Sequence, residues 1–365
     1  MDRAAETTSA VQAAFTRGLA SQTSGGAAAG VFVEGQLILD AHGGEAKPGQ
    51  PWKPHTLVNV YSAAKPLAAA CALLLWDRGQ LELDQRVATY WPEYAQAGKE
   101  RTTVRMLLAH QAGLLVLRER QSAHMLLDFE RLVELLAAEP PVFEPGSAHG
   151  EHALFYGHLI GELVRRIDGR PLGRFFREEI AEPWRLDFHF GLERADETRA
   201  ATLLHPGADW RQEVLANRGD LYRQALDNPP GALDLDVVNG AVWRTAGLPA
   251  VGGHGTALAL ARFYAGFAAG GALDGVRLFR PGTVAEALQP ARVGPDVLLG
   301  RDVAWGLGFQ IDGDIFGMAG IGGSDGWGYT ELRYGCGYVT NHLRDHDRAE
   351  QIDHALRSGD RAPPS

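Results

Sequence analysis

The sequence predicts an α+β fold with two lobes, in which both ends of the chain form one antiparallel sheet and an all-helical lobe is inserted between them. Three observations point to this architecture. Short apolar runs flank Glu34-Gly35 near the start of the chain, as in a β-hairpin. From about residue 56 to 300 the apolar spacing is mostly helical, and after Gly300 short runs rich in β-branched and aromatic residues return. Strands and helices segregated in this way favour an α+β arrangement.

We expect one domain over residues 1–365, with a sheet lobe of about residues 1–60 and 300–365 and a helical lobe of about residues 80–300. Residues 5–20 predict a surface helix, and the hairpin VFVEGQLILDAHGG follows. The helical lobe contains FERLVELLAAEP, which stops before Pro140, and HLIGELVRRIDG, which ends at Gly169. The later strands are VAWGLGFQID, DIFGMAG, GYTEL and CGYVTNH, and DRAEQIDHALRSG predicts a closing helix. A cleft between the lobes is the expected place for a site.

The composition is that of a soluble globular protein, because 45% of the 365 residues are hydrophobic and 22% are charged. A formal net charge of −10 gives no electrostatic reason to expect nucleic acid or an anionic membrane as a partner. The N-terminus is acidic where a signal peptide is positive, and no apolar run has membrane-spanning length, so we expect a cytoplasmic protein. Cys71 and Cys336 make neither a disulfide framework nor a zinc site. The expected partner is a small-molecule substrate, with the oligomeric state left open.

The segment SAAKPLAAACALLLW carries the first chemical signal. Proline is tolerated only in the first turn of a helix, so Pro66 places Ser62 at a helix N-terminus, where the helix dipole favours an alkoxide. Ser62 and Lys65 are three residues apart and share one helix face. The rest of the helix is apolar, so Lys65 enters the interior, where desolvation favours the neutral amine that can accept the serine proton. The alternative is a capping serine followed by a lysine that reaches solvent.

Residues 58–114, which include this segment and continue through LLAHQAGL, resemble the serine β-lactamase and penicillin-binding-protein superfamily, most closely class C β-lactamases and the esterases that share their fold. FEPGSAHGEHALFYGHLIGELVRRIDGRPL, GGHGTALALARFYAGFAAGG and MAGIGGSDGWGYTELRYGCGYVTN agree in the same order. The resemblance implies an acyl intermediate on Ser62, an oxyanion hole made by the backbone N–H groups of Ser62 and Ile321, and no metal or organic cofactor.

Two positions depart from the pattern of this superfamily. Its second motif has a tyrosine six residues after the proline of a Pro-Gly pair, where this chain has Glu151 after Pro145. Glu151 either acts as a general base or neutralises a buried Lys65. The third motif has a lysine or histidine where this chain has Met318, followed by Ala319 and Gly320. Without that positive charge we expect an uncharged or apolar ester, amide or thioester.

Several other residues are candidate lining of the cleft. We expect Trp305, Trp327 and Tyr329 to form aromatic walls, with a core role as the alternative for each. Met318 and Gly320 are expected beside the nucleophile, and His149 is expected to line the cleft as a polar group. Tyr156 is the alternative candidate for the role of the missing tyrosine, but its helical position favours core packing.

Three competing motifs are weaker. GGSDG resembles the nucleophile elbow of α/β-hydrolases, but a strand follows it instead of a helix, so Ser324 is not favoured as a nucleophile. HLRDH has two histidines four residues apart without the glutamate and third ligand of a zinc hydrolase. His110 ends a predicted helix, which favours a packing role.

The sequence therefore predicts a serine acyl-transfer enzyme, an esterase-like hydrolase or transacylase, that acts on a small molecule through an acyl-Ser62 intermediate. Its rewired proton relay favours a specialised role in secondary metabolism. The alternative is a degenerate β-lactamase-fold protein that binds a ligand or promotes a non-covalent reaction.

Overall fold

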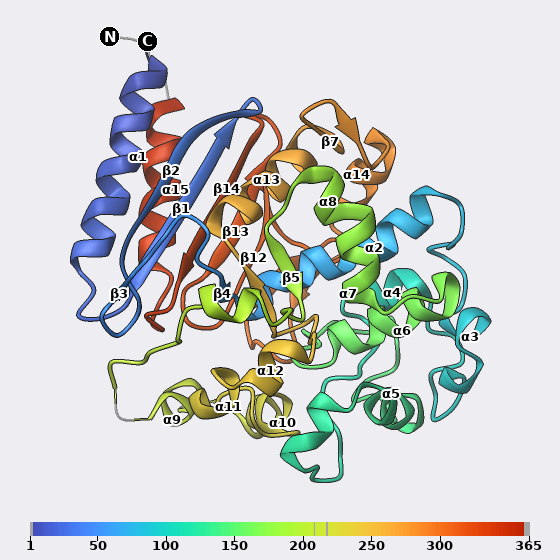
Figure 1. The fold of residues 1–365 in the computed structure, drawn as a ribbon. Coiled ribbons are helices and arrows are strands. Elements are labelled where there is room, and N and C mark those ends of the chain that lie inside the picture. The colour runs from blue at the N-terminus through green and yellow to red at the C-terminus, as the bar shows by residue number, and fades with distance from the viewer. Residues whose placement is uncertain (1–2, 208, 217, 361–365) are drawn as a thin grey trace.

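The computed structural model describes residues 3–207, 209–216 and 218–360 and confirms the α+β class (Figure 1). Within these residues one antiparallel sheet has nine strands, in the order β3-β2-β1-β14-β13-β12-β11-β10-β9. The two ends of the chain meet in the sheet because β1 pairs with β14 along its length. The strands are β1 (Gly26–Val33), β2 (Gln36–Lys47), β3 (Gln50–Pro51), β9 (Arg292–Pro295), β10 (Asp302–Trp305), β11 (Gln310–Asp312), β12 (Ile315–Ala319), β13 (Asp325–Tyr329) and β14 (Tyr334–Thr340).

Helices lie on both faces of this sheet. α1 (Arg3–Ala20) and α15 (Asp347–Asp360) run side by side over one face, where they bury an apolar cluster against β1, β13 and β14 (Figure 1). α13 (Ala257–Ala268) packs on the opposite face, against β14 and β1. The contact between α13 and β14 requires glycine, because a Cβ at Gly335 would lie 2.1 Å from the backbone nitrogen of Ala265.

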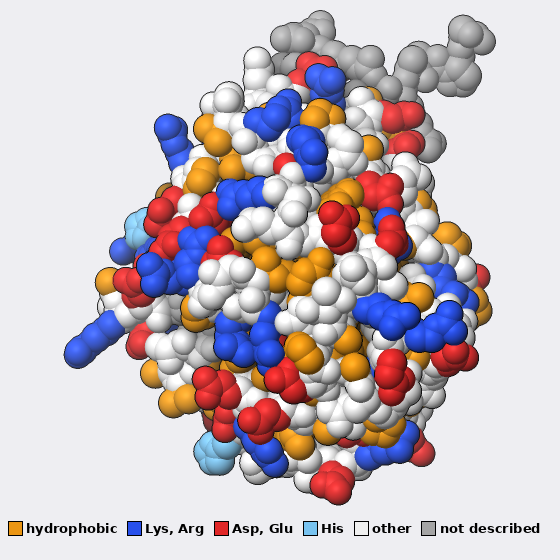
Figure 2. All heavy atoms as spheres, turned by 90° about the vertical axis from the view of Figure 1, so that its right-hand side faces the viewer, with side chains coloured by type: hydrophobic (Ala, Val, Ile, Leu, Met, Phe, Trp, Pro, Cys, Tyr) orange, Lys and Arg blue, Asp and Glu red, His pale blue; other side chains and the backbone are white. Residues whose placement is uncertain are grey.

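The helical part surrounds α2 (Lys65–Asp77), whose residues are buried from Lys65 to Leu75. Positive and negative side chains are interspersed over the face that this part presents in Figure 2. Its helices are α3 (Val87–Tyr90), α4 (Val104–Leu108), α5 (Phe129–Ala138), α6 (Tyr156–Asp168), α7 (Leu172–Phe176), α8 (Glu182–Trp184), α9 (Trp210–Leu215), α10 (Asp220–Asp227), α11 (Leu235–Val238) and α12 (Ala241–Thr245), with α14 (Pro281–Leu288) nearby. The remaining strands are β4 (Val58–Asn59), β5 (Phe188–Phe190) and β6 (Gly253–Gly255), which form a small sheet, and the pair β7 (Ala272–Leu273) and β8 (Val276–Arg277).

The predicted surface helix, N-terminal hairpin and closing helix are present. Among the predicted later strands, DIFGMAG and CGYVTNH correspond to β12 and β14, and VAWGLGFQID is divided into β10 and β11. The prediction of GYTEL as a strand is wrong beyond its first two residues, because β13 ends at Tyr329 and residues 330–333 form the turn into β14. The predicted end of the helical lobe at about residue 300 is too late, because α13 packs on the large sheet and β9 belongs to it. A helical pattern does not reveal which lobe the helix packs on, and the short sequence of β9 has no apolar alternation. None of the described helices is both long and apolar enough to cross a membrane.

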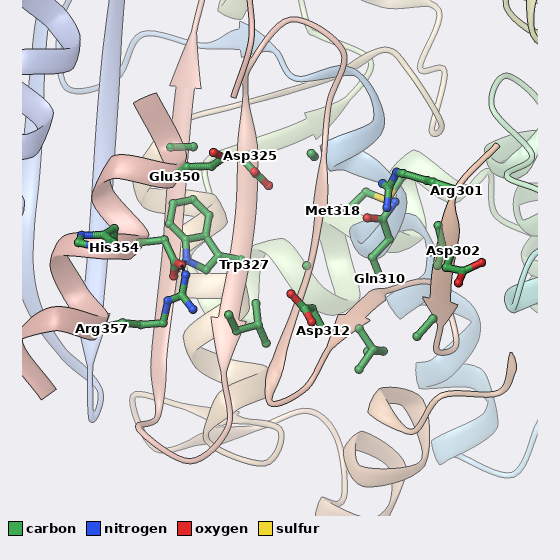
Figure 3. Close-up of a pocket in the computed structure, with 18 of the residues that line it drawn as sticks. Arg301, Asp302, Gln310, Asp312, Met318, Asp325, Trp327, Glu350, His354 and Arg357 are labelled. Carbon is green, nitrogen blue, oxygen red and sulfur yellow. Dashed lines mark hydrogen bonds and ion pairs between the residues drawn. The ribbon is translucent and has the colours of Figure 1, made fainter. Parts of the chain in front are cut away.

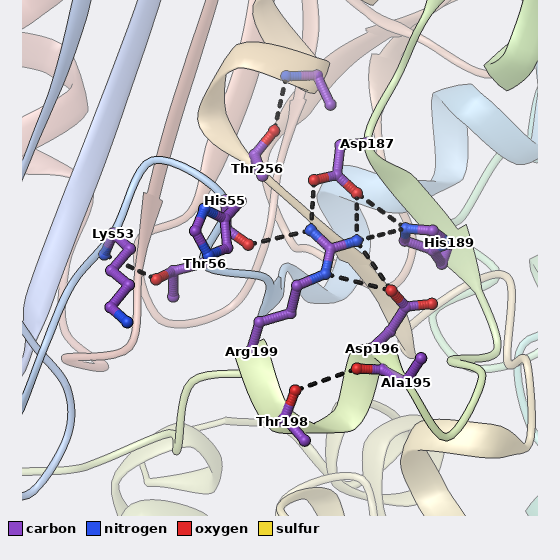
Figure 4. A network of polar contacts seen from close by, with 11 residues as sticks. Lys53, His55, Thr56, Asp187, His189, Ala195, Asp196, Thr198, Arg199 and Thr256 are labelled. Atoms are coloured by element: carbon purple, nitrogen blue, oxygen red, sulfur yellow. Dashed lines mark hydrogen bonds and ion pairs between the residues drawn. The ribbon is translucent and has the colours of Figure 1, made fainter.

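A polar network fixes the chain just before β4 and therefore the approach to Ser62 (Figure 4). The guanidinium of Arg199 donates to both carboxylate oxygens of Asp187, at 2.5 and 2.8 Å, and to the carbonyl oxygen of His55 at 3.1 Å. Burial raises the pKa of Asp187, but hydrogen bonds from His189 and Arg199 outweigh that effect and hold it at about 2. The network therefore joins β5 to the segment that leads into the nucleophile turn.

Candidate active site

Ser62 lies in a short 3₁₀ turn, Tyr61–Ala64, that continues directly into α2. The preceding residue, Tyr61, has a φ of 49°, a left-handed conformation that is rare for a bulky side chain and marks local backbone strain. The turn holds the Ser62 side chain at the floor of a cavity, with 6% of the residue exposed. The predicted placement of Ser62 at the start of the buried helix is therefore observed.

Lys65 is fully buried and its ammonium group contacts three acceptors. Its Nζ lies 2.6 Å from Ser62 Oγ, 3.0 Å from Glu151 Oε1 and 3.3 Å from the carbonyl oxygen of Ala250. Burial lowers the pKa of Lys65 below its usual value, and the adjacent Glu151 carboxylate opposes that shift. The side chain does not extend to solvent, so the snorkelling alternative is wrong.

Glu151 comes from the loop before α6 and completes the cluster. Its Oε1 lies 3.5 Å from Ser62 Oγ as well as 3.0 Å from Lys65 Nζ. A buried carboxylate, Asp296, anchors this loop from the strand side: its Oδ1 accepts from the backbone N–H of Glu151 at 3.4 Å, and its Oδ2 accepts from Trp305 Nε1 at 2.9 Å. Glu151 therefore stands on a loop that is tied to the sheet.

The end of β12 lies against the nucleophile turn. A Cβ at Gly320 would lie 2.0 Å from the carbonyl oxygen of Val60, so only glycine allows this approach. The following turn contains two glycines of positive φ, Gly322 and Gly323, and within the described residues it leaves the N–H of Ile321 without a hydrogen-bond acceptor. Ile321 and Ser62 line the same cavity. This is the arrangement expected for two oxyanion donors.

The cavity above Ser62 has a volume of about 600 Å³ and is lined by both apolar and charged side chains. Apolar and aromatic groups include Trp210, Val214, Tyr222, Leu226, Leu298 and Met318. Charged or titratable groups include Glu151, Glu213, Arg218, Arg301, Arg344, Asp345 and His346.

Two of the residues predicted to line the cleft are instead buried beside it. Trp305 is fully buried and donates to Asp296, so it supports the loop of Glu151 from behind and forms no wall of the cavity. His149 is also buried, and its Nε2 lies 3.0 Å from the carbonyl oxygen of Gly294. Both predictions of direct substrate contact are wrong because these side chains connect the loop to β9 and β10.

Trp327 and Tyr329 point to the other side of the sheet. They are two residues apart on β13, so their side chains share one face, and both belong to the cluster under α1 and α15. Trp327 donates from Nε1 to Asp353 Oδ1 on α15 at 3.0 Å, and Tyr329 stacks on Tyr334 with ring centroids 5.3 Å apart. The predicted aromatic walls are therefore absent from the cavity of Ser62, which Met318 and Gly320 do line. Trp327 instead lines a separate groove on the face that carries α15 (Figure 3).

The residues that were not favoured as catalytic have structural contacts. Ser324 Oγ accepts from the backbone N–H of Thr340 at 3.1 Å. The hydroxyl of Tyr156 donates to the carbonyl oxygen of Leu108 at 3.0 Å. In HLRDH, His342 Nδ1 lies 3.2 Å from Ser24 Oγ, and among the described residues no three acidic, histidine or cysteine groups are arranged to hold a metal ion.

His110 lies behind Lys65 and pairs with His152, with their Nδ1 atoms 3.3 Å apart. The backbone N–H of His152 donates to His110 Nδ1 at 3.1 Å, so that nitrogen carries no proton. Burial lowers the pKa of both rings, that of His152 to about 3, and the neighbouring Lys65 adds to this effect. Two neutral rings therefore lie close enough to Lys65 to feel its charge.

Sequence reasoning missed Asp296, Trp210, Tyr222 and Arg301. Each is an isolated residue, far along the chain from Ser62 and outside any motif. The local start of α9 at Trp210, capped by Asp209, is visible in the sequence, but its position over the cavity is not.

Comparisons with known proteins agree with the fold. The family model described as "Beta-lactamase" matches residues 11–360. Esterase/beta-lactamase LipL of Mycobacterium tuberculosis is 33% identical, over 94% of this chain and 82% of its own. The crystal structure of a family VIII carboxylesterase is 33% identical with a TM-score of 0.89, covering 97% of both chains. A penicillin-binding protein homologue from Caulobacter crescentus is 33% identical with a TM-score of 0.88, covering 98% of both chains.

Proposed function

The chain belongs to the β-lactamase family and is a serine hydrolase of the β-lactamase-like superfamily, and on that premise we propose that it is an esterase-type enzyme whose nucleophile is Ser62. The proposed substrate is a small-molecule ester, amide or thioester. One observation carries the proposal: a serine hydroxyl lies 2.6 Å from a buried lysine, and that lysine lies 3.0 Å from a carboxylate, at the floor of a cavity.

In the proposed acylation, Ser62 Oγ forms a bond to the carbonyl carbon of the substrate. Lys65 takes the hydroxyl proton as it passes one of its own protons to Glu151, so the net transfer is from Ser62 to the carboxylate. The carbonyl π electrons move to oxygen, and the N–H groups of Ser62 and Ile321 stabilise that charge. One such donor is worth about 3 kcal/mol in barrier height.

When the tetrahedral intermediate collapses, the bond to the leaving group breaks and protonated Glu151 returns its proton to that group. Deacylation repeats the steps with water, or with an amine or alcohol as the acceptor. The cavity beside Ser62, about 600 Å³ in volume, has room for an acyl chain and a leaving group. This chain has Glu151 where the second motif has a tyrosine, and this difference supports a specialised reaction. We propose that the reaction belongs to secondary metabolism.

A fluorophosphonate tests covalent catalysis directly. We expect intact-mass spectrometry to find one adduct on the wild-type protein and none on Ser62→Ala. Ser358→Ala, at an exposed position on α15, is the matched control and should keep the adduct. An adduct that persists in Ser62→Ala would show that Ser62 is not the nucleophile and would overturn the proposal. If the wild-type protein forms no adduct with the fluorophosphonate or with a range of activated esters, the proposal is also overturned, in favour of non-covalent ligand binding.

A further inference from the structure

The positive charge that the third motif lacks at position 318 is present elsewhere in the cavity. Met318 is buried and packs in a small cluster with Val303 and Trp305, so it offers no charge to a substrate. The same cavity nevertheless contains three guanidinium groups, those of Arg218, Arg301 and Arg344.

The carboxylates of the cavity do not neutralise all of these groups. Glu151 pairs with Lys65, and Glu213 lies 2.9 Å from the Nε2 of His205. Asp345 lies 3.9 Å from the Nε of Arg344.

Arg301 forms no ion pair with any described carboxylate. It is exposed, and its guanidinium presents N–H donors in the fork geometry that matches a carboxylate.

Figure 3 shows where this free charge lies. The guanidinium of Arg301 extends alongside Met318 and the amide of Gln310, whereas the carboxylate of Asp302 points away from it. Arg301, Gln310 and Met318 line both the cavity of Ser62 and an adjoining groove of about 1060 Å³ on the sheet face. Arg301 therefore lies where the cavity meets the groove, beside Met318, the position at which the third motif has a lysine or histidine.

We infer that Arg301 replaces the missing third-motif cation, and that the enzyme prefers esters carrying a carboxylate in addition to the scissile bond. This inference rests on the proposed function and revises the expectation of an uncharged substrate. A planar guanidinium can donate two parallel hydrogen bonds to a carboxylate, and the Gln310 amide adds a further donor beside it. Arg301 is therefore a specificity-determining residue and takes no part in proton transfer.

The test compares two esters that differ in a terminal charge, mono-4-nitrophenyl adipate and 4-nitrophenyl hexanoate. The measured quantity is the ratio of their kcat/KM values. We expect the wild-type enzyme to prefer the adipate, Arg301→Gln to lower the ratio about tenfold, as for the loss of one charge-assisted contact, and Arg301→Lys to lie between them. Arg86→Gln, at an exposed position outside the cavity, should change neither rate. Raising the salt concentration should shrink the wild-type preference.

A pair of aryl acetates places the charge on the leaving group instead: 3-carboxyphenyl acetate and phenyl acetate. A preference lost in Arg301→Gln with either pair supports the inference and tells which side of the scissile bond faces Arg301. If Arg301→Gln changes kcat/KM equally for both members of both pairs, the inference about Arg301 is overturned, even when all hydrolysis depends on Ser62. Hydrolysis that survives Ser62→Ala would instead refute the proposed function.

Discussion

Replacing Glu151 by glutamine separates its two interpretations, a general base and a counter-ion. The amide keeps the size of the side chain and removes its charge, 3.0 Å from Lys65 Nζ. Glu151 opposes the burial that lowers the pKa of Lys65, so its removal moves that pKa further down. A larger fraction of Lys65 is then neutral at any given pH.

The two interpretations therefore predict opposite results. If Glu151 receives the proton, Glu151→Gln should lower kcat by about 10²- to 10⁴-fold, the usual contribution of a general base, with a much smaller change in KM. If Glu151 is only a counter-ion, the more neutral Lys65 should sustain turnover and carry it to lower pH than in the wild type.

The assay is hydrolysis of a 4-nitrophenyl ester between about pH 5 and 9, within the range where carboxylates and shifted lysines titrate. Fluorophosphonate titration of Ser62 gives the concentration of competent sites, and a thermal melt shows that Glu151→Gln is folded. Wild-type or higher turnover in Glu151→Gln, with the acidic limb displaced to lower pH, would refute the relay proposed above.

Three further predictions concern the supports of the site. Asp296→Ala leaves four N–H groups without an acceptor: the indole N–H of Trp305 and the backbone N–H groups of Glu151, Leu298 and Leu299. We expect a loss of about 3 kcal/mol in stability, measured by urea unfolding, and a lower kcat. Gly320→Ala places a methyl group on a backbone oxygen, so little soluble protein should be recovered, whereas Gly282→Ala, which has open space around its Cβ and no left-handed φ, should be recovered well. Asp187 has a depressed pKa of about 2, so its contribution to stability is present above about pH 4 and is lost as pH falls towards 2; acid-unfolding curves of Asp187→Asn should lack that part of the pH dependence.

The nucleophile and its neighbours could be located because local rules act on them. Pro66 fixes the start of α2, and the spacing from Ser62 to Lys65 then places both side chains on one face. The position of Glu151 after Pro145 aligned it with the missing tyrosine, and the structure brings it into the cluster. Gly320 followed from its place in the third motif.

The walls of the cavity could not be predicted in the same way. β13 is buried on both faces, so its sequence does not tell which face Trp327 occupies. Asp296 and Glu151 are 145 positions apart and meet only after the loop packs on β9. Arg301 is one exposed arginine among many until β10, β11 and β12 pair and place it beside Met318.

The pairing of β1 with β14 has a consequence for synthesis of the protein. A ribosome releases the first hairpin long before the strand that must lie beside it, so β1 waits with one edge open while most of the polypeptide is made. The sheet can therefore be completed only near the end of translation. A message truncated before Tyr334 would yield a chain without β14, so that β1 and β13 would have no strand between them.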